Sequence, residues 1–301
     1  EEKIMTQAQA LQKLLDAPGI TPMPGVFDPI STRIAERAGF EAAFMSGFNV
    51  AAARIGMPDT GLISYTEMLD QGRNLVDAVS IPIIGDGDTG WGNAINIKRT
   101  VKGYAAAGFA CIMLEDQLAP KRCGHTEGKE VISRAEACIR FRAAVDAREE
   151  IRTEGGDILI MARTDANENH GIEEAMERCR EFRRIGVDIT FMEGPKNLDE
   201  MRRYCDEVDG PKMANMVEQG KIPFLRPAEL EDIGYKLAIW PSSIMLASIQ
   251  GMQAEMARLA SGDVGEEGKA TFLELQDLVG FPAYYDQEKK YSFNNMDQAA
   301  E

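Results

Sequence analysis

Several features that would exclude a soluble enzyme are missing from this sequence. It has no apolar run approaching the ~20 residues that a membrane-spanning helix needs. Its five cysteines are scattered and include no Cys-x-x-Cys pair, so neither a disulfide framework nor a structural zinc site is indicated. The first residues contain no apolar signal core, and the last residues contain no targeting or lipidation pattern. We therefore expect a cytoplasmic protein.

Basic residues are also scarce relative to acidic ones. The chain has 33 Lys and Arg against 49 Asp and Glu, which gives a net charge of -16. A protein this negative repels nucleic acids and anionic membranes at a distance, so we expect neither as a partner. An anionic substrate would need a local cation, such as a metal ion, to hold it.

What the sequence does contain is a repeated pattern of apolar runs. Hydrophobic residues make up 44% of the 301 residues, enough to bury a core and to exclude disorder. Most runs are non-alternating, as expected for parallel strands buried on both faces, and each is followed by a polar segment and a helical stretch. The eight runs are Pro24–Phe27, Ala42–Met45, Ile81–Ile84, Ala110–Leu114, Ile158–Ala162, Ile189–Met192, Lys212–Asn215 and Leu237–Trp240.

Eight consecutive strand–helix units predict an α/β protein with a (β/α)8 (TIM) barrel. A doubly wound open sheet has a similar content and is the alternative. No Pro- or Ser-rich linker divides the chain, so we expect one barrel domain over residues 1–301. Residues 242–301 hold more helix than the eighth unit needs. We expect residues 262–301 to form a helical tail that packs on a partner subunit.

Polar residues follow the predicted strands at the ends where a barrel carries its active site. Residues 85–90 match the pattern GxGxxG of a dinucleotide-binding loop, but Asp86 and Asp88 inside it would repel a pyrophosphate. Two carboxylates at positions i and i+2 of a strand end point the same way. Together with Glu115 after the next strand, they predict an oxygen-rich site for Mg²⁺ or Mn²⁺. The alternative is a set of solvated loop acids.

Two further groups carry reactive chemistry. In Lys121-Arg122-Cys123-Gly124-His125 a thiol lies between basic residues, which can lower its pKa and prepare it for proton transfer. A buried, inert cysteine is the alternative, but its neighbours are too polar for a core position. Arg163 ends an apolar strand, where a cation is costly unless it meets an anion. We interpret it as a bidentate clamp on a substrate carboxylate, or as the partner of Glu193, or as both.

The stretch from Lys121 to His125 resembles the K-[KR]-C-G-H signature of the isocitrate lyase/phosphoenolpyruvate mutase superfamily. Other segments resemble the same family in the same order, and the resemblance covers residues 20–260. They are Pro24-Gly25-Val26-Phe27-Asp28, Ser46-Gly47, the loop of Asp86 and Asp88, Leu114-Glu115-Asp116 and Ala162-Arg163-Thr164-Asp165. Together these motifs are far more specific than any one of them.

The resemblance implies a barrel whose last helix is exchanged between subunits of a homo-oligomer, a dimer-of-dimers tetramer. It implies that Asp86 binds Mg²⁺ and that Asp59, Asp88 and Glu115 act on the ion mainly through water. The substrate-binding residues it implies are Ser46, Gly47, Phe48, Gly124, Asn215, Pro241 and Ser242. Its catalytic group comprises Cys123, which protonates an enediolate carbon, with Arg163, His125, Lys121 and Glu193.

Within the superfamily, the Cys-Gly-His loop favours enzymes that break a carbon–carbon bond. Leu246 and Phe272 stand where 2-methylisocitrate lyases are expected to carry arginines for an additional carboxylate. A smaller dicarboxylate is therefore favoured, and Val217 after Asn215-Met216 suits a methyl-bearing malate. Our leading substrate is 2,3-dimethylmalate, cleaved to pyruvate and propionate.

Three other functions remain open on the sequence. An oxaloacetate hydrolase, which yields oxalate and acetate, is expected to have a Ser where Pro241 stands, although Ser242 is adjacent. A 2-methylisocitrate lyase is a second alternative. A catalytically inactive barrel used for binding is a third, but it would have no reason to keep the complete acidic, thiol and guanidinium set.

Overall fold

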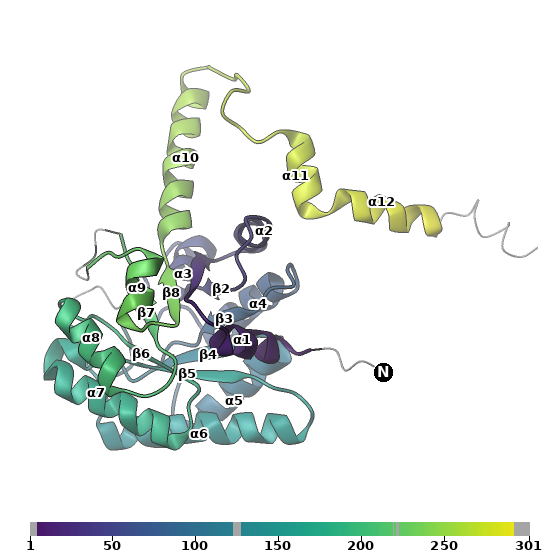
Figure 1. Ribbon diagram of the computed structural model, residues 1–301. Coiled ribbons are helices and arrows are strands. Elements are labelled where there is room, and N and C mark those ends of the chain that lie inside the picture. Colours follow the sequence, from purple (N-terminus) through teal and green to yellow (C-terminus); the bar gives the residue numbers. More distant parts are fainter. Residues whose placement is uncertain (1–4, 123–127, 219, 221–222, 292–301) are drawn as a thin grey trace, which may run out of the picture. The chain divides into compact units, whose positions relative to one another are not determined.

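The computed structural model describes residues 5–122, 128–218, 220 and 223–291 (Figure 1). Its eight strands are parallel and lie in the order β6-β5-β4-β3-β2-β1-β8-β7. A bridge between Thr190 and Lys212 connects β6 to the residue before β7, so the barrel is nearly closed. The strands are β1 (Thr21–Val26), β2 (Ala43–Met45), β3 (Ile83–Asp86), β4 (Cys111–Glu115), β5 (Leu159–Thr164), β6 (Ile189–Met192), β7 (Met213–Asn215) and β8 (Leu237–Trp240).

This strand order confirms the predicted barrel and excludes the doubly wound sheet. In a barrel each strand lies beside the next one in the chain and the first lies beside the last, and β1 indeed pairs with both β2 and β8. A doubly wound sheet instead reverses its strand order at a switch point. All eight predicted strands are present within a few residues of their expected positions.

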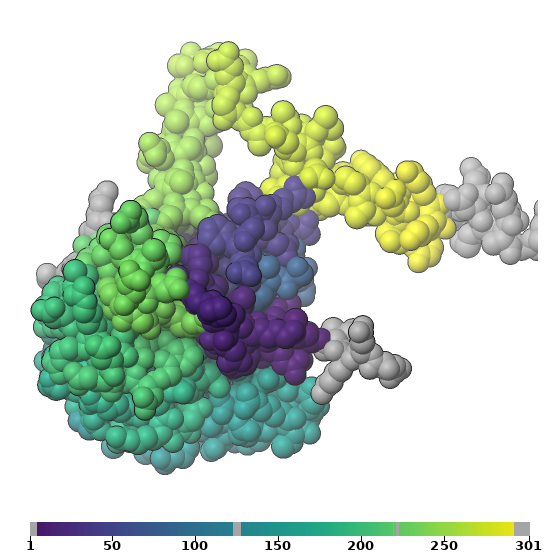
Figure 2. Space-filling view, viewed as in Figure 1, coloured from purple at the N-terminus to yellow at the C-terminus, as the bar shows by residue number. Residues whose placement is uncertain are grey.

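Helices follow the strands along the chain. Figure 2 shows that α6 to α9, in teal and green, form a continuous surface on one side of the molecule. The helices of the first 242 residues are α1 (Gln7–Asp16), α2 (Pro29–Arg37), α3 (Gly47–Ile55), α4 (Tyr65–Val76), α5 (Ala94–Ala106), α6 (Arg134–Thr153), α7 (Asn167–Ile185), α8 (Leu198–Glu207) and α9 (Pro227–Ile233). None of the helices that the structure describes is long and apolar enough to cross a membrane.

Strand β1 begins three residues earlier than the sequence predicts. Its first residues include Pro22 and Pro24, and proline is unusual inside a strand, so the sequence did not indicate this start. Thr21 N donates to Lys236 O near the start of β8. Since N–H groups alternate between the two sides of a strand, the N–H groups that Pro22 and Pro24 lack would face β2. Pairing with β2 begins only at Gly25, so the missing donors cost no ladder hydrogen bond.

One end of the barrel is covered by α1. Leu11 and Leu15 pack into the same apolar cluster as Met23 of β1 and Leu237 of β8. The side chain of Gln7 donates to Ser80 O, just before β3, which places α1 at the amino-terminal ends of the strands. The carboxyl-terminal ends are therefore the end left for a functional site.

The chain divides into two compact units, residues 1–247 and 248–301. Helix α10 (Ser243–Ala260) begins in the first unit, and α11 (Phe272–Val279) and α12 (Phe281–Lys290) belong to the second. Large apolar side chains of the second unit are exposed, among them Phe272, Leu273 and Tyr284. The domain boundaries and the helix exchange stay predictions.

Candidate active site

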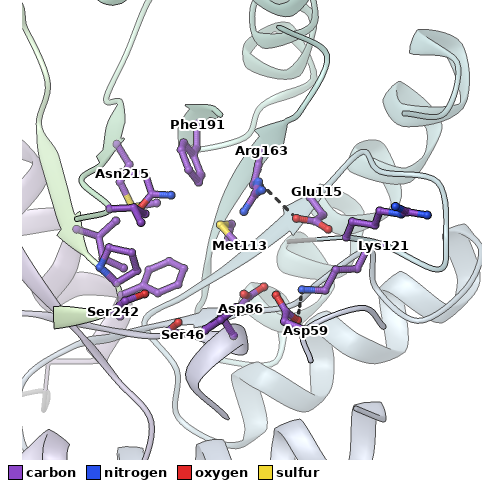
Figure 3. A pocket seen from close by; sticks show the side chains of 17 residues that line it. Ser46, Asp59, Asp86, Met113, Glu115, Lys121, Arg163, Phe191, Asn215 and Ser242 are labelled. Carbon is purple, nitrogen blue, oxygen red and sulfur yellow. Dashed lines mark ion pairs between the residues drawn. The ribbon is translucent and has the colours of Figure 1, made fainter. Parts of the chain in front are cut away.

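A pocket lies at the carboxyl-terminal ends of the strands, where the sequence predicts the site (Figure 3). Its charged lining lies on one side, around Glu115 and Lys121, and the uncharged polar groups of Asn215 and Ser242 lie on the other. The described lining residues are Phe44, Ser46, Phe48, Asp59, Asp86, Met113, Glu115, Lys121, Arg122, Arg163, Phe191, Met213, Asn215, Val217, Ile239, Pro241 and Ser242.

The predicted acidic cluster is assembled, and it contains a cation of the chain itself. Asp59, Asp86 and Glu115 line the pocket, and Asp88 is buried beside them. The Lys121 ammonium lies 2.5 Å from Asp59 Oδ1 and 2.8 Å from Asp88 Oδ1. The side chain of Lys121 is only 5% exposed, so this ion pairing takes place away from bulk solvent. Lys121 thus offsets part of the negative charge of the cluster.

Asp86, at the end of β3, is held in a fixed orientation. Its Oδ2 accepts from Gly47 N at 3.1 Å, and its Oδ1 accepts from Asp88 N at 3.0 Å. A Cβ on residue 47 would lie 2.5 Å from Asp86 Oδ2, so this approach requires glycine. Ser46 caps α3 by accepting from Asn49 N, and both Ser46 and Phe48 at this end of α3 line the pocket. The first residue of α3 is therefore hydrogen-bonded to Asp86, which fixes the two relative to each other in the site.

Asp88 reaches the cluster by a different route from the predicted one. Strand β3 ends at Asp86, and Asp88 has a φ of 45°, a left-handed conformation that is rare for a residue with a side chain. The turn is fixed to β4, because Gly87 N donates to Met113 O at 2.7 Å and Glu115 N donates to Asp88 O at 2.9 Å. The alternation of side chains along a strand therefore does not explain its position.

Burial makes these carboxyl groups weak acids. It raises the pKa of Asp88 to about 7, against the opposing effect of Lys121. Burial also raises the pKa of Asp86 and of Glu115, although Lys121 and Arg163 oppose the shift. Burial alone would lower the pKa of Lys121, but Asp88 and Glu115 raise it well above its ordinary value. The solvated-acid alternative is therefore wrong for these residues.

The oxygen atoms of the cluster fit a hard divalent cation. Asp88 Oδ2 and Glu115 Oε1 are buried and have no hydrogen-bond partner within the part of the chain that the structure describes. Among those residues, no group of three or more His, Cys, Asp or Glu side chains is arranged as a ready-made metal cluster. Mg²⁺ needs no such cluster, since it is usually bound through one or two carboxylates and keeps several waters.

Arg163 lies next to Glu115, because the two residues are in register on β5 and β4. Its Nε lies 3.4 Å from Glu115 Oε2, and its Nη2 lies 3.8 Å from Glu193 Oε2. The predicted Arg–Glu pairing is therefore present. The fork formed by Nε and Nη2 is occupied by Asp165, at 2.9 Å for both bonds, so this edge is not the one that clamps a substrate.

The electrostatic setting of Arg163 keeps it charged. Burial opposes the charge, but Asp165 and Glu115 raise its pKa well above the ordinary value. Burial would raise the pKa of Asp165, whereas Arg163 and Lys129 lower it to about 2. The guanidinium also lies over the Phe191 ring, with its Cζ 5.2 Å from the ring centroid. Arg163 is thus a permanent cation at the wall of the pocket.

The remaining predicted residues are partly in the lining. Ser46, Phe48, Asn215, Pro241 and Ser242 line the pocket, whereas Gly47, Asp88 and Glu193 do not and lie beside it. Asn215 Nδ2 donates to Glu193 Oε2 at 3.2 Å. Pro241 O accepts from Asn49 Nδ2 at 2.6 Å, which fixes the end of β8. Cys123, Gly124 and His125 lie outside the described residues.

Sequence reasoning missed the apolar floor of the pocket. Its five residues each lie two positions before a predicted rim residue, which is the spacing of side chains on one face of a strand. The period of two was the signal that would have found them, once the rim was placed. The five are Phe44, Met113, Phe191, Met213 and Ile239.

Known protein sequences resemble this chain over most of its length. A family model described as phosphoenolpyruvate phosphomutase matches residues 11–260. The chain is 38% identical over 291 residues to a 2,3-dimethylmalate lyase of Eubacterium barkeri, with 96% of this chain and 99% of that protein covered. It is 37% identical over 283 residues to a 2-methylisocitrate lyase of Aeropyrum pernix, with 93% and 88% covered.

Solved structures also match over nearly the whole chain. An oxaloacetate acetylhydrolase bound to the inhibitor 3,3-difluorooxalacetate has a TM-score of 0.90 at 32% identity, covering 95% of this chain and 97% of that one. A 2,3-dimethylmalate lyase has a TM-score of 0.90 at 33% identity, covering 96% of both. A phosphonopyruvate hydrolase in complex with oxalate and Mg²⁺ has a TM-score of 0.83 at 26% identity, covering 95% and 99%.

Proposed function

Because the chain belongs to the phosphoenolpyruvate mutase/isocitrate lyase superfamily, we propose that it is a lyase that breaks a carbon–carbon bond in a small 2-hydroxy dicarboxylate. The leading substrate is 2,3-dimethylmalate. Transfer of the 2-hydroxyl proton to one of the buried carboxylates of the site and cleavage of the C2–C3 bond release pyruvate and the enediolate of propionate. Protonation of the enediolate carbon then gives propionate.

The observation that carries this proposal is the division of the pocket into a charged and an apolar part. The cations of the described lining are Lys121, Arg122 and Arg163, and all lie in segments that follow β4 or end β5. The rest of the wall offers Phe44, Val217 and other apolar side chains that suit methyl groups. At Leu246 and Phe272, where arginines are expected for an additional carboxylate, the chain carries no cation. This division favours a methyl-bearing diacid over a triacid.

The residues divide the chemistry between them. Arg163 attracts the carboxylate and the 2-oxyanion through the N–H groups that Asp165 does not use. Ser46 and Phe48, at the amino-terminal end of α3, offer polar hydrogens to a substrate carboxylate, while the N–H of Gly47 holds Asp86. Cys123 donates the proton to the enediolate carbon, with His125 beside it in the sequence. Lys121 holds Asp59 and Asp88 in place, and Glu193 with Asn215 completes the polar wall.

The cofactor that we propose is Mg²⁺, which Mn²⁺ can replace. Asp86 would bind it directly, and Asp59, Asp88 and Glu115 would hold its waters. When bound, the ion supplies a Lewis acid that stabilises negative charge on the substrate oxygen. It also reconciles an acidic protein with a doubly negative substrate.

The test of this function is a product assay on a panel of acids. The enzyme is incubated with Mg²⁺ and either 2,3-dimethylmalate, 2-methylisocitrate or oxaloacetate, and pyruvate and oxalate are measured. We expect pyruvate from 2,3-dimethylmalate at the highest kcat/KM, and no product with the variant Asp86→Asn. Oxalate from oxaloacetate, without pyruvate from any malate, would contradict the lyase.

Oxaloacetate hydrolysis is the second candidate, and Ser242 is the observation that favours it. Ser242 lines the pocket directly after Pro241, so a hydroxyl group is within the site despite the proline. The variant Ser242→Ala separates the two functions. A hydrolase that depends on this hydroxyl should lose oxalate release, whereas a lyase should keep its pyruvate release within about three-fold, as for a peripheral contact.

Binding of Mg²⁺ should depend on pH because its ligands must lose protons. With the pKa of Asp88 at about 7, we expect the affinity for Mg²⁺ to rise about ten-fold from about pH 6 to about pH 8. The stability of the metal-free protein should change with pH in the opposite direction to the Mg²⁺ affinity. A carboxyl whose pKa is raised from 3.8 takes up a proton on folding, so the metal-free protein loses stability as pH rises toward 7.

Calorimetric titration of Mg²⁺ at both pH values checks this prediction, and thermal unfolding at each pH measures the stabilisation by the ion. We expect the shift in Tm at a fixed Mg²⁺ concentration to be larger at the higher pH. Equal affinities at the two pH values would contradict it. The variant Asp88→Asn should bind Mg²⁺ more weakly and with a flatter pH dependence.

We also propose that the protein is a homo-oligomer, a tetramer built as a dimer of dimers in which the tail helices are exchanged. The exposed apolar side chains of α11 and α12 support this proposal, since a solvated tail would leave them uncovered. Light scattering should give a mass about four times that of the 33.1-kDa chain. Deletion of residues 262–301 should yield a smaller or heterogeneous assembly. An unchanged, monodisperse oligomer would contradict the exchange.

A further inference from the structure

Lys129 is a buried cation that the proposed chemistry does not use. Its side chain is 2% exposed, and neither Lys129 nor Asp165 belongs to the described lining of the pocket. Its Nζ lies 3.1 Å from Asp165 Oδ1 and 2.9 Å from Glu168 Oε2. The side chain of Asn169 donates to Lys129 O. The residue is thus held from both its backbone and its side chain at the start of α7.

Asp165 connects this cation to Arg163. Its Oδ1 receives both Lys129 Nζ and Arg163 Nη2, and its Oδ2 receives Arg163 Nε. The carboxylate side chain is fully buried, and its backbone N–H donates to Asp116 Oδ1 at 3.0 Å. A bidentate pair fixes the plane of a guanidinium only if the carboxylate itself cannot rotate. Lys129 supplies a third bond that prevents this rotation.

The charges around Arg163 also require a second cation. Glu115, Asp165 and Glu193 all lie within 4 Å of its guanidinium. Without Lys129, these three buried carboxylates would be balanced by one cation fewer, and a negative substrate would be repelled more strongly. Lys129 adds a positive charge without occupying space in the pocket.

We propose that Lys129 is a positioning residue for Arg163, acting through Asp165 to fix the guanidinium that binds the anionic substrate. The inference rests on the proposed role of Arg163 at that substrate. It predicts that a side chain outside the pocket controls the affinity for anions within it. The effect should vanish when Arg163 no longer provides the fork.

Oxalate binding in the presence of Mg²⁺ tests the inference on the full chain, without any turnover. We expect Lys129→Met to raise the dissociation constant of oxalate about ten-fold, as is typical when an outer partner of a site residue is removed. Lys129→Arg, which keeps the charge and the hydrogen bonds, should stay within about three-fold of the unaltered protein. Where Lys129→Met does not fold cooperatively, Lys129→Gln replaces it, with the same expectation.

A double-mutant cycle separates positioning from general destabilisation. In the background of Arg163→Lys, the change at Lys129 should alter oxalate affinity by less than about two-fold, because the fork is already lost. Lys212→Met is the matched control. Lys212 is also a buried lysine, 4% exposed, but it precedes β7 and so lies at the opposite end of the barrel. Its loss should leave oxalate affinity unchanged.

The outcomes are distinct. An oxalate affinity that Lys129→Met leaves within two-fold, or an equal loss in both backgrounds, overturns the positioning role while the proposed function stands. A loss of the same size in Lys212→Met also overturns it, because any buried lysine would then suffice. Failure of the unaltered protein to bind oxalate with Mg²⁺ overturns the proposed function and this inference together.

Discussion

Replacing Arg163 by Lys is expected to lower kcat/KM by about 10²–10³-fold, the usual loss when one stabilising donor of an anionic transition state is removed. Lys keeps the positive charge, so the loss measures the geometry of the guanidinium. Asp165 uses Nε and Nη2 of Arg163 at 2.9 Å each, and the remaining N–H groups are those available to the substrate. An ammonium on a flexible stem cannot serve both partners in fixed directions.

Steady-state kinetics on the best substrate of the acid panel measures this effect. Arg148→Lys is the matched control, since Arg148 is equally buried, at 6% against 8% exposed, and is also ion-paired. It pairs with Asp188, which precedes β6 and so lies at the opposite end of the barrel. We expect the control to keep its activity. A loss below ten-fold in Arg163→Lys, or an equal loss in the control, would contradict the proposal that Arg163 stabilises the transition state.

Replacing Cys123 by Ser is expected to lower kcat by about 10²–10⁴-fold, the contribution typical of a positioned general acid. A hydroxyl group is a much weaker acid than a thiol and cannot protonate the enediolate at a useful rate. Cys123 is not among the proposed metal or carboxylate partners. The affinities for Mg²⁺ and oxalate should therefore stay within about two-fold of the unaltered protein.

Turnover in deuterium oxide adds a readout specific to proton transfer. The unaltered enzyme should place one deuterium at C2 of propionate with a single configuration. Any residual product of Cys123→Ser should carry a mixture of configurations, because solvent would then protonate the free enediolate. Cys138→Ser, on α6, is the control and should behave as the unaltered enzyme. Near-normal turnover of Cys123→Ser would exclude the thiol from the mechanism.

The eight strands and the rim of the site could be predicted from the sequence for a simple reason. Parallel strands buried on both faces consist of short apolar runs that can be recognised in the sequence, and their carboxyl ends lie together at one end of a barrel. Asp86, Glu115 and Arg163 each end such a run, so their proximity followed from the order of the elements. The structure places Glu115 and Arg163 in direct register.

The position of Asp88 shows where this reasoning stops. The spacing of two from Asp86 predicted the right residue, but the strand ends before it and a left-handed turn carries it into the cluster. That turn depends on hydrogen bonds to β4, a different part of the chain. A local pattern does not contain such bonds, so it could not give the reason.

By itself, the sequence determined the barrel, the acidic rim and the residues of the family motifs, because each depends on local periodicity or on contiguous residues. Only the tertiary structure decided how the charges are paired. Lys121 lies between Asp59 and Asp88, and the fork of Arg163 is occupied by Asp165, which also pairs with Lys129. Lys121 and Lys129 lie in other segments of the chain than the carboxylates they pair with. The energy of a buried ion pair depends on distance and desolvation, which are set only when the chain is folded.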